Sequence, residues 1–313
     1  MSLLIGALTI GLILSLLGVA VYISFKIFSF PDMSCEGSFT LGAAVSAVLL
    51  IAGWGALPAT LAGMCAGAFA GMLTGLIHTR LNINALLAGI LVMTALYSVN
   101  LRIMGSSNLP LTSVHTFADA ASDLGKTFFG DAERITIFGR TALVHDVCVL
   151  LAIAAIVLAV TAILLAFFAT HAGLAMRATG DNSQMIRALG VSDGTMQTIG
   201  LALSNALAAL AGSLMAQFQG FCDVQMGIGM LVAGLAAVIL GEALVGGRKL
   251  SHFIIGTLLG ALLFRLLVAV ALRVGLEPND LKLITALFVL LALVSPMLLK
   301  RLRTHRAPGA AHA

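Results

Sequence analysis

Nine long apolar runs, separated by short polar or Gly/Pro-containing breaks, constrain the fold of this chain more than any other feature. They cover residues 3–25, 39–53, 56–77, 84–101, 147–169, 196–217, 228–246, 252–273 and 281–299. A helix of about 20 apolar residues crosses a hydrocarbon core about 30 Å thick, and backbone inside lipid must satisfy its own hydrogen bonds. The runs therefore predict an all-α, polytopic transmembrane helix bundle of about 8–10 spans.

The composition excludes a soluble enzyme. Of the 313 residues, 60% are hydrophobic and only 10% are charged, and the mean hydropathy is +1.10. This apolar fraction exceeds what a soluble domain of ordinary composition carries. We expect one transmembrane domain over residues 1–306, embedded in the cell (inner) membrane as a multi-pass protein. A disordered tail over residues 307–313 follows it, because that segment contains only Ala, Gly, Pro and His.

The run over residues 39–53 is the weakest of the nine, because it is short and its approach is polar. Residues 30–38 read FPDMSCEGS and place Pro31, Asp32 and Glu36 directly before the apolar run. A plain loop and a broken or re-entrant segment at membrane depth both fit this pattern.

Basic residues indicate the orientation. If the C-terminus is cytoplasmic, ten of the 17 Lys and Arg residues fall on the cytoplasmic side and the N-terminus lies outside. The ten are Lys26, Arg80, Arg177, Arg187, Arg248, Lys249, Lys300, Arg301, Arg303 and Arg306. They lie in short loops and a tail with no aromatic platform beside them, so orientation in a lipid bilayer explains the charge of +4 better than binding of nucleic acid does.

Four glycines recur every four residues in the run over 56–77: Gly63, Gly67, Gly71 and Gly75. At this spacing they form one smooth helical face that lets another helix approach closely. The alternative is that glycine is simply common here, since the chain has 33.

The loop over residues 169–195 is predicted to hold a short capped helix. Asp181, Asn182 or Ser183 caps its start, and Gly190 ends it after Leu189. Its apolar side chains form a face too small for a core, so the helix either docks a cytosolic partner or lies on lipid.

This loop carries a resemblance to a known family. Residues 173–182 (GLAMRATGDN) and 188–191 (ALGV), followed by an Ala/Gly-rich run, resemble the cytoplasmic coupling loop of ABC importer permeases of the branched-chain amino acid and ribose type. Residues 30–32 and 36–39 resemble a subgroup often associated with aromatic amino acids. The similarity extends over almost the whole chain, including residues 240–246.

The resemblance implies a non-catalytic permease subunit that carries a small solute, such as an amino acid. It implies a second permease copy in a homodimer or paired complex, separate ABC ATPase subunits that hold ATP and Mg, and an extracytoplasmic solute-binding protein. The loop residues that it assigns to ATPase contact are Arg177, Asp181, Asn182, Met185, Arg187, Leu189 and Gly190. We expect no cofactor and no metal in this chain, whose cysteines lie far apart in sequence.

Polar residues in or beside the runs are candidates for a solute pathway, because such groups are costly in a membrane. Arg265 lines a pathway, or pairs with Glu242 or a backbone carbonyl. Glu242 forms a gate, or an ion pair with Arg248 or Lys249. Asp32, Glu36 and Asn84 line a pathway, or cap helices and loops.

An ion-coupled secondary transporter is the alternative function. It requires inverted repeats and buried carboxylates at mid-span, and the sequence shows no convincing repeat.

Overall fold

The computed structural model describes residues 2–129, 134–137, 140–245, 249–273, 275, 283, 285–287, 289–291 and 294. The helices are α1 (Ser2–Val21), the π-helix η1 (Tyr22–Ile27), α2 (Ser34–Ile51), α3 (Ala56–Leu81), α4 (Ala85–Met104), α5 (Phe117–Phe129), α6 (Val144–Ala169), α7 (His171–Asp181), α8 (Ser183–Ala188), α9 (Asp193–Gln219), α10 (Met230–Val245) and α11 (Leu250–Arg273). The strands are β1 (Asn108–Pro110), β2 (Arg134–Ile137), β3 (Arg140–Leu143) and β4 (Phe221–Asp223).

The predicted polytopic all-α bundle is confirmed. Within the described residues, seven helices are long and apolar enough to cross a membrane, α1 and η1 counting as one, and α10 is a shorter apolar helix. Eight of the nine predicted runs thus coincide with helices. Of the ninth run, residues 281–299, the structure describes only scattered positions, and the tail over 307–313 lies outside the described residues.

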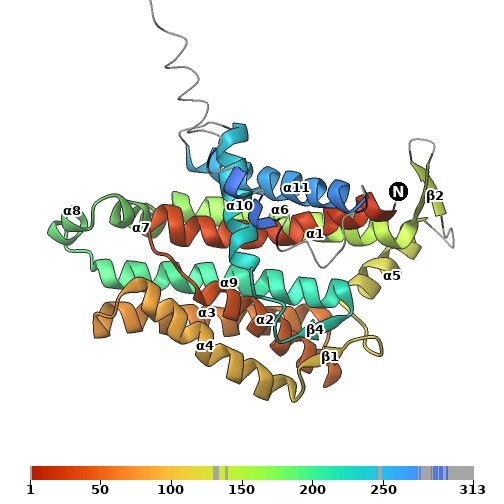
Figure 1. The fold of residues 1–313 in the computed structure, drawn as a ribbon, viewed down its shortest axis with the longest axis horizontal. Helices are drawn as coiled ribbons and strands as arrows, with labels where there is room; N and C mark the ends of the chain where they lie inside the picture. Colours follow the sequence, from red (N-terminus) through yellow and green to blue (C-terminus); the bar gives the residue numbers. More distant parts are fainter. Residues whose placement is uncertain are drawn as a thin grey trace, which may run out of the picture.

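The long helices lie side by side, with α9 between two groups (Figure 1). On one side of α9 lie α1, α6 and α11, and on the other lie α2, α3 and α4. Helices α1, α2 and α9 are mostly buried, whereas most residues of α3, α4 and α6 are exposed or only partly buried. Exposed apolar side chains are the expected surface of a protein whose solvent is lipid. Helix α10 crosses the other helices steeply (Figure 1).

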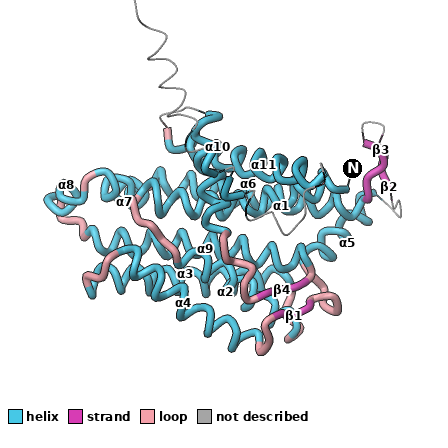
Figure 2. The backbone as a smooth tube through the Cα atoms, in the orientation of Figure 1, coloured by secondary structure: helices cyan, strands magenta, loops and turns pink. Residues whose placement is uncertain are grey.

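The two ends of the bundle differ (Figure 2). Helices α7 and α8 project at one end, which we call the α8 end. The other end, the strand end, carries α5 and two small antiparallel sheets, β1 with β4 and β2 with β3. The pairing of Leu109 with Cys222 ties the segment after α4 to the segment after α9.

Glycines on α3 face α9 and allow close helix contact. Gly63, Gly67, Gly71 and Gly75 are all buried. A Cβ on Gly75 would lie 2.6 Å from the Cα of Thr198, and a Cβ on Gly67 would overlap the Cβ of Ala209. Any side chain on this face would therefore separate α3 from α9, as at other small-residue membrane interfaces.

The chain breaks between η1 and α2. Residues 28–33 are not helical, and Ser29 has a φ of +50°. Helix α2 begins at Ser34, so the boundary predicted at residue 39 is wrong by five residues. The first residues of α2 are fully buried, which agrees with the broken segment and not with an exposed loop. The sequence did not reveal that α2 begins at Ser34, because its first turn is polar and the partners of these polar side chains lie on helices distant in the sequence.

Candidate functional site

Asp32 lies in the break at the start of α2 and is fully buried. Its Oδ1 accepts hydrogen bonds from the amide of Ser34 at 2.9 Å and from the Ser34 hydroxyl at 2.5 Å. Its Oδ2 accepts one from Nδ2 of Asn205 on α9 at 2.7 Å, and the Cys35 thiol lies at 3.4 Å. A buried carboxylate requires such donors, and the first amides of a helix require an acceptor. Asp32 therefore attaches the start of α2 to the middle of α9.

Neighbouring helices extend this polar network. The Thr74 hydroxyl of α3 donates to the Ser34 hydroxyl at 3.0 Å. The Ser204 hydroxyl of α9 donates to the carbonyl of Ala20 in α1 at 2.8 Å. Four helices, α1, α2, α3 and α9, thus meet around the break. Sequence reasoning missed Asn205, although a single amide in the middle of an apolar run is a signal for an intramembrane polar site.

Glu36 accepts hydrogen bonds from backbone amides at the start of α10. Its Oε1 accepts hydrogen bonds from the amide of Gly229 at 3.0 Å and the amide of Leu231 at 3.3 Å. A carboxylate at a helix N-terminus is favoured both by the unpaired amides and by the helix dipole. Asp32 and Glu36, both predicted as pathway candidates, therefore hold the N-termini of two helices inside the bundle.

Two further pathway candidates lie near the α8 end. Glu242 on α10 forms an ion pair with Lys26 of η1, with Oε1 and Nζ 2.7 Å apart. The predicted partner Lys249 does not form this pair, and Arg248 lies outside the described residues. Asn84 caps α4, because its Oδ1 accepts from the amide of Leu86 at 2.9 Å. Asn84 thus has the capping role that the sequence left open.

Arg265 lies in α11, between two cavities. One of them, about 220 Å³, lies between α1 and α11. The other, about 380 Å³, is lined by α1, α9, α10 and α11 and by Thr285 and Ala286. None of the ion pairs found among the described residues joins Arg265 to Glu242. The structure therefore does not support the predicted pair between these two side chains.

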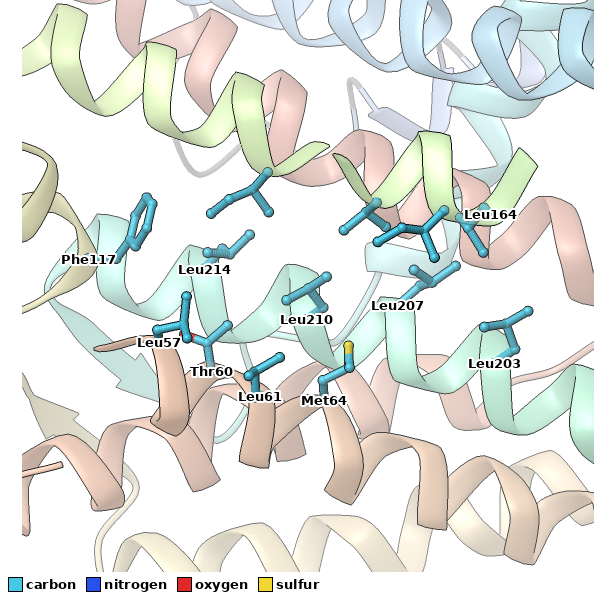
Figure 3. Close-up of a pocket in the computed structure, with 13 residues that line it drawn as sticks. Leu57, Thr60, Leu61, Met64, Phe117, Leu164, Leu203, Leu207, Leu210 and Leu214 are labelled. Carbon is cyan, nitrogen blue, oxygen red and sulfur yellow. The ribbon is translucent and has the colours of Figure 1, made fainter. Parts of the chain in front are cut away.

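Figure 3 shows a groove between α3, α6 and α9 with a volume of about 330 Å³. Leu57, Leu61 and Met64 face Leu207 and Leu210 across it, and Phe117 of α5 lies at one end (Figure 3).

The polar lining of this groove is already occupied. Thr60 is the polar side chain among its described lining residues. The Thr60 hydroxyl donates to the carbonyl of Ala56 and accepts from Nε2 of Gln217, both at 2.7 Å. The groove offers no partner to a charged solute and suits apolar groups.

Gln217 also joins α5 to the bundle at the strand end. Its Oε1 accepts from the amide of Phe117 at 3.0 Å. Nearby, Oδ2 of Asp119 accepts from both the amide and the hydroxyl of Thr116, each at 2.8 Å. Burial raises the pKa of Asp119, but these two hydrogen bonds, together with the nearby His115 and His145, lower it below its ordinary value.

The segment resembling a coupling loop contains two helices where one was predicted. Asn182 caps α8, with its Oδ1 accepting from the amide of Met185 at 3.0 Å. Gly190 follows with a φ of +83°, a conformation that glycine adopts without strain. Helix α7 was not predicted, because residues 171–181 are short and mixed in polarity.

The coupling segment, residues 171–193, exposes apolar side chains at the α8 end. Leu174 is 49% exposed, Met185 55% and Leu189 66%. Arg177 of α7, another predicted contact residue, is half-buried. The remaining predicted contact residues are exposed: Asp181, Asn182, Arg187 and Gly190. Arg187 forms an ion pair with Asp193 at 2.7 Å, which closes the segment onto the start of α9.

Helix α7 also packs on the broken helix. A Cβ on Gly180 would overlap the carbonyl oxygen of Ile27, the last residue of η1. The coupling segment is therefore in direct contact with the helix that ends at the break.

Among the described residues, no group of three or more His, Cys, Asp and Glu side chains is placed to hold a metal ion.

The described residues form a multi-pass helix bundle with a break between η1 and α2 and a projecting segment, residues 171–193, which is the architecture of an integral membrane protein. The sequence profile described as "Branched-chain amino acid transport system / permease component" matches residues 3–294. The chain belongs to this family of ABC importer permeases, as the resemblance predicted.

Curated relatives agree with the family. The chain is 40% identical over 290 residues to a tyrosine transport system permease protein of Clostridioides difficile (strain R20291), covering 93% of this chain and 90% of the relative. It is 30% identical to an uncharacterized protein of Rickettsia prowazekii (strain Madrid E), covering 94% and 98%. The autoinducer 2 import system permease LsrC of Escherichia coli O157:H7 is 39% identical over 111 residues, which cover 34% of this chain and 32% of the relative. No solved structure matches the chain.

Proposed function

We propose that this chain forms, with a second copy, the membrane pathway of an ABC importer for an aromatic amino acid. Separate ATPase subunits, which hold ATP and Mg, drive it, and an extracytoplasmic binding protein delivers the solute. The chain contributes a single permease domain and no catalysis. The coupling segment carries the proposal, because it exposes Leu174, Met185 and Leu189 while α7 contacts η1. An ATPase bound there can act on the break near Asp32.

The solute class rests on one relative. The tyrosine permease of Clostridioides difficile aligns over nearly the full length of both chains. The LsrC match covers about a third of the chain and supports the family without supporting autoinducer 2 as the solute.

The same proposal places the α8 end in the cytoplasm. Lys26, Arg80, Arg177, Arg187 and Lys249 all belong to that end or its loops, as the positive-inside rule requires. The N-terminus of α1 is then outside and the C-terminus inside. A membrane-impermeant thiol reagent should label Ser183→Cys only in inside-out vesicles and Ser113→Cys only in intact cells, above the cysteine-free parent. The reverse pattern would contradict this orientation.

Copurification tests the proposed partners. The tagged chain, isolated from native membranes in mild detergent, should bring an ATPase subunit with it. Met185→Asp and Leu189→Asp should reduce the copurified ATPase about tenfold, because charge replaces exposed apolar contact residues. Gln184→Asp is the matched control, since Gln184 is an exposed polar residue of the same helix. Recovery of the wild-type chain alone would favour an ion-coupled secondary transporter.

A further inference from the structure

The cavity beside Arg265 is enclosed mostly by carbon and carries one cationic side chain. Four buried apolar residues are part of its lining: Leu14, Met215, Phe264 and Val268. Its polar lining residues are Gln219, Arg265 and Thr285, and Gln219 is exposed where α9 ends. Its volume of about 380 Å³ falls in the range of small-molecule sites, which combine apolar walls with a few placed polar groups.

Arg265 lies within a helix, α11, that is long and apolar enough to cross a membrane. It precedes the last residue of α11, Arg273, by eight positions, which at 1.5 Å per residue is about 12 Å along the helix axis. An arginine at this depth is costly unless a counter-charge or hydrogen-bond acceptors meet it. Such residues normally mark a ligand or ion path for this reason.

Among the described residues, Arg265 has no hydrogen-bonded or ion-paired partner. No Asp or Glu is among the described residues that line the cavity, and the two carboxylates of the neighbouring helices α2 and α10 have other partners. Glu36 holds the amides of Gly229 and Leu231, and Glu242 is paired with Lys26. Gly229, which itself lines the cavity, therefore has its amide turned to Glu36 and not to a ligand.

We propose that Arg265 binds the carboxylate of the transported solute, with the apolar walls of the cavity holding the solute's side chain. A guanidinium presents two parallel N–H donors that match the two oxygens of a carboxylate. The charge of the cavity selects an anionic group, and its carbon walls favour an aromatic or aliphatic body over a sugar. This proposal rests on the proposed import function and assigns one solute contact within it.

The test measures solute selectivity in proteoliposomes that contain the copurified importer complex and its binding protein. Labelled tyrosine is the transported probe, and unlabelled tyrosine and tyramine, which lacks the carboxylate, are the competitors. For the wild type, tyramine should compete about tenfold more weakly than tyrosine, because it leaves Arg265 without its partner. If tyramine inhibits uptake by the wild-type complex as strongly as unlabelled tyrosine does, the proposal is overturned.

Variants separate the charge from the fold. Arg265→Gln should raise the KM for tyrosine about tenfold and remove the preference over tyramine, since the charged donor is lost. Arg265→Lys keeps the charge and should retain the preference with weaker affinity. Arg273→Gln, an exposed arginine of the same helix, is the matched control and should behave as the wild type.

Binding to the permease alone distinguishes a solute site from a lipid site and from a folding defect. The purified chain in lipid nanodiscs should be stabilised against thermal unfolding by tyrosine but not by tyramine, in neutral and in anionic lipid alike. Stabilisation that follows anionic lipid instead would assign Arg265 to a lipid headgroup and overturn the proposal. Uptake by Arg265→Gln with unchanged selectivity would also overturn it, while leaving the import function intact. Absence of uptake by the wild-type complex would contradict the import function itself.

Discussion

Asn205 of α9 donates a 2.7 Å hydrogen bond to Asp32, 173 residues earlier in the chain, inside the bundle. This bond joins the most buried helix to the break between η1 and α2. Because the coupling segment contacts the other side of the break through Ile27, the contacts form a continuous connection from the α8 end to the centre of the bundle.

Removing the acceptor at this position should destabilise the bundle. Asp32→Ala leaves the backbone amide of Ser34 without its acceptor and removes one of the two hydrogen bonds that Nδ2 of Asn205 donates, the other going to the carbonyl of Leu201. Each buried donor left unsatisfied costs about 1–3 kcal/mol. Thermal unfolding of the purified chain in detergent measures the loss. Asp181→Ala, at an exposed carboxylate, is the control. Equal stability of the two variants would show that the network does not hold the break.

A methyl group at Gly180 should uncouple the ATPase from the pathway. Gly180→Ala pushes α7 away from the carbonyl of Ile27 but leaves the exposed contact residues on α8 unchanged. ATPase copurification should persist, while solute-stimulated ATP hydrolysis falls about tenfold, as expected when a mechanical contact between two-state elements is altered. Gly6→Ala is the control, because a Cβ there meets open space. Normal stimulation in Gly180→Ala would show that this contact does not transmit motion.

The ion pair of Lys26 and Glu242 should contribute little to stability. Its side chains are 48% and 30% exposed, and such pairs typically contribute about 0–1 kcal/mol. Glu242→Lys should nevertheless impair uptake, since it places two cations together where η1 meets α10. Combining it with Lys26→Glu should restore uptake, if the pair acts by attraction alone. Failure of the double variant, with the complex intact, would assign Glu242 a separate role in gating.

The attachment of α5 should depend on pH through Asp119. Hydrogen bonds from Thr116 hold the pKa of this carboxyl below its ordinary value of about 3.9. A depressed folded pKa contributes stability above the unfolded pKa, and this contribution disappears as the pH falls through the lowered folded value. Amide hydrogen exchange of α5 should therefore be faster in Asp119→Asn than in the wild type at pH 7. The difference should shrink as the pH falls below about 4; a constant difference would contradict this assignment.

The apolar runs predicted the spans because burial in lipid imposes length and composition on each helix. They did not predict where α2 begins, since Ser34 and Glu36 are polar and their partners, Asn205 and Gly229, lie far away in sequence. The sequence likewise suggested Arg248 or Lys249 as partners of Glu242 because they are near in sequence, whereas the partner found is Lys26, 216 residues away. Helix α7 escaped prediction because it has only 11 residues of mixed polarity and so does not stand out as an apolar run.

The source of energy is the most direct test of the account. Proteoliposomes containing the chain with its copurified ATPase and binding protein should accumulate labelled tyrosine only when ATP and Mg are present on the α8 side, and an ion gradient should have no effect. Accumulation by the chain alone, driven by an ion gradient without ATP, would contradict the account and identify the protein as a secondary transporter.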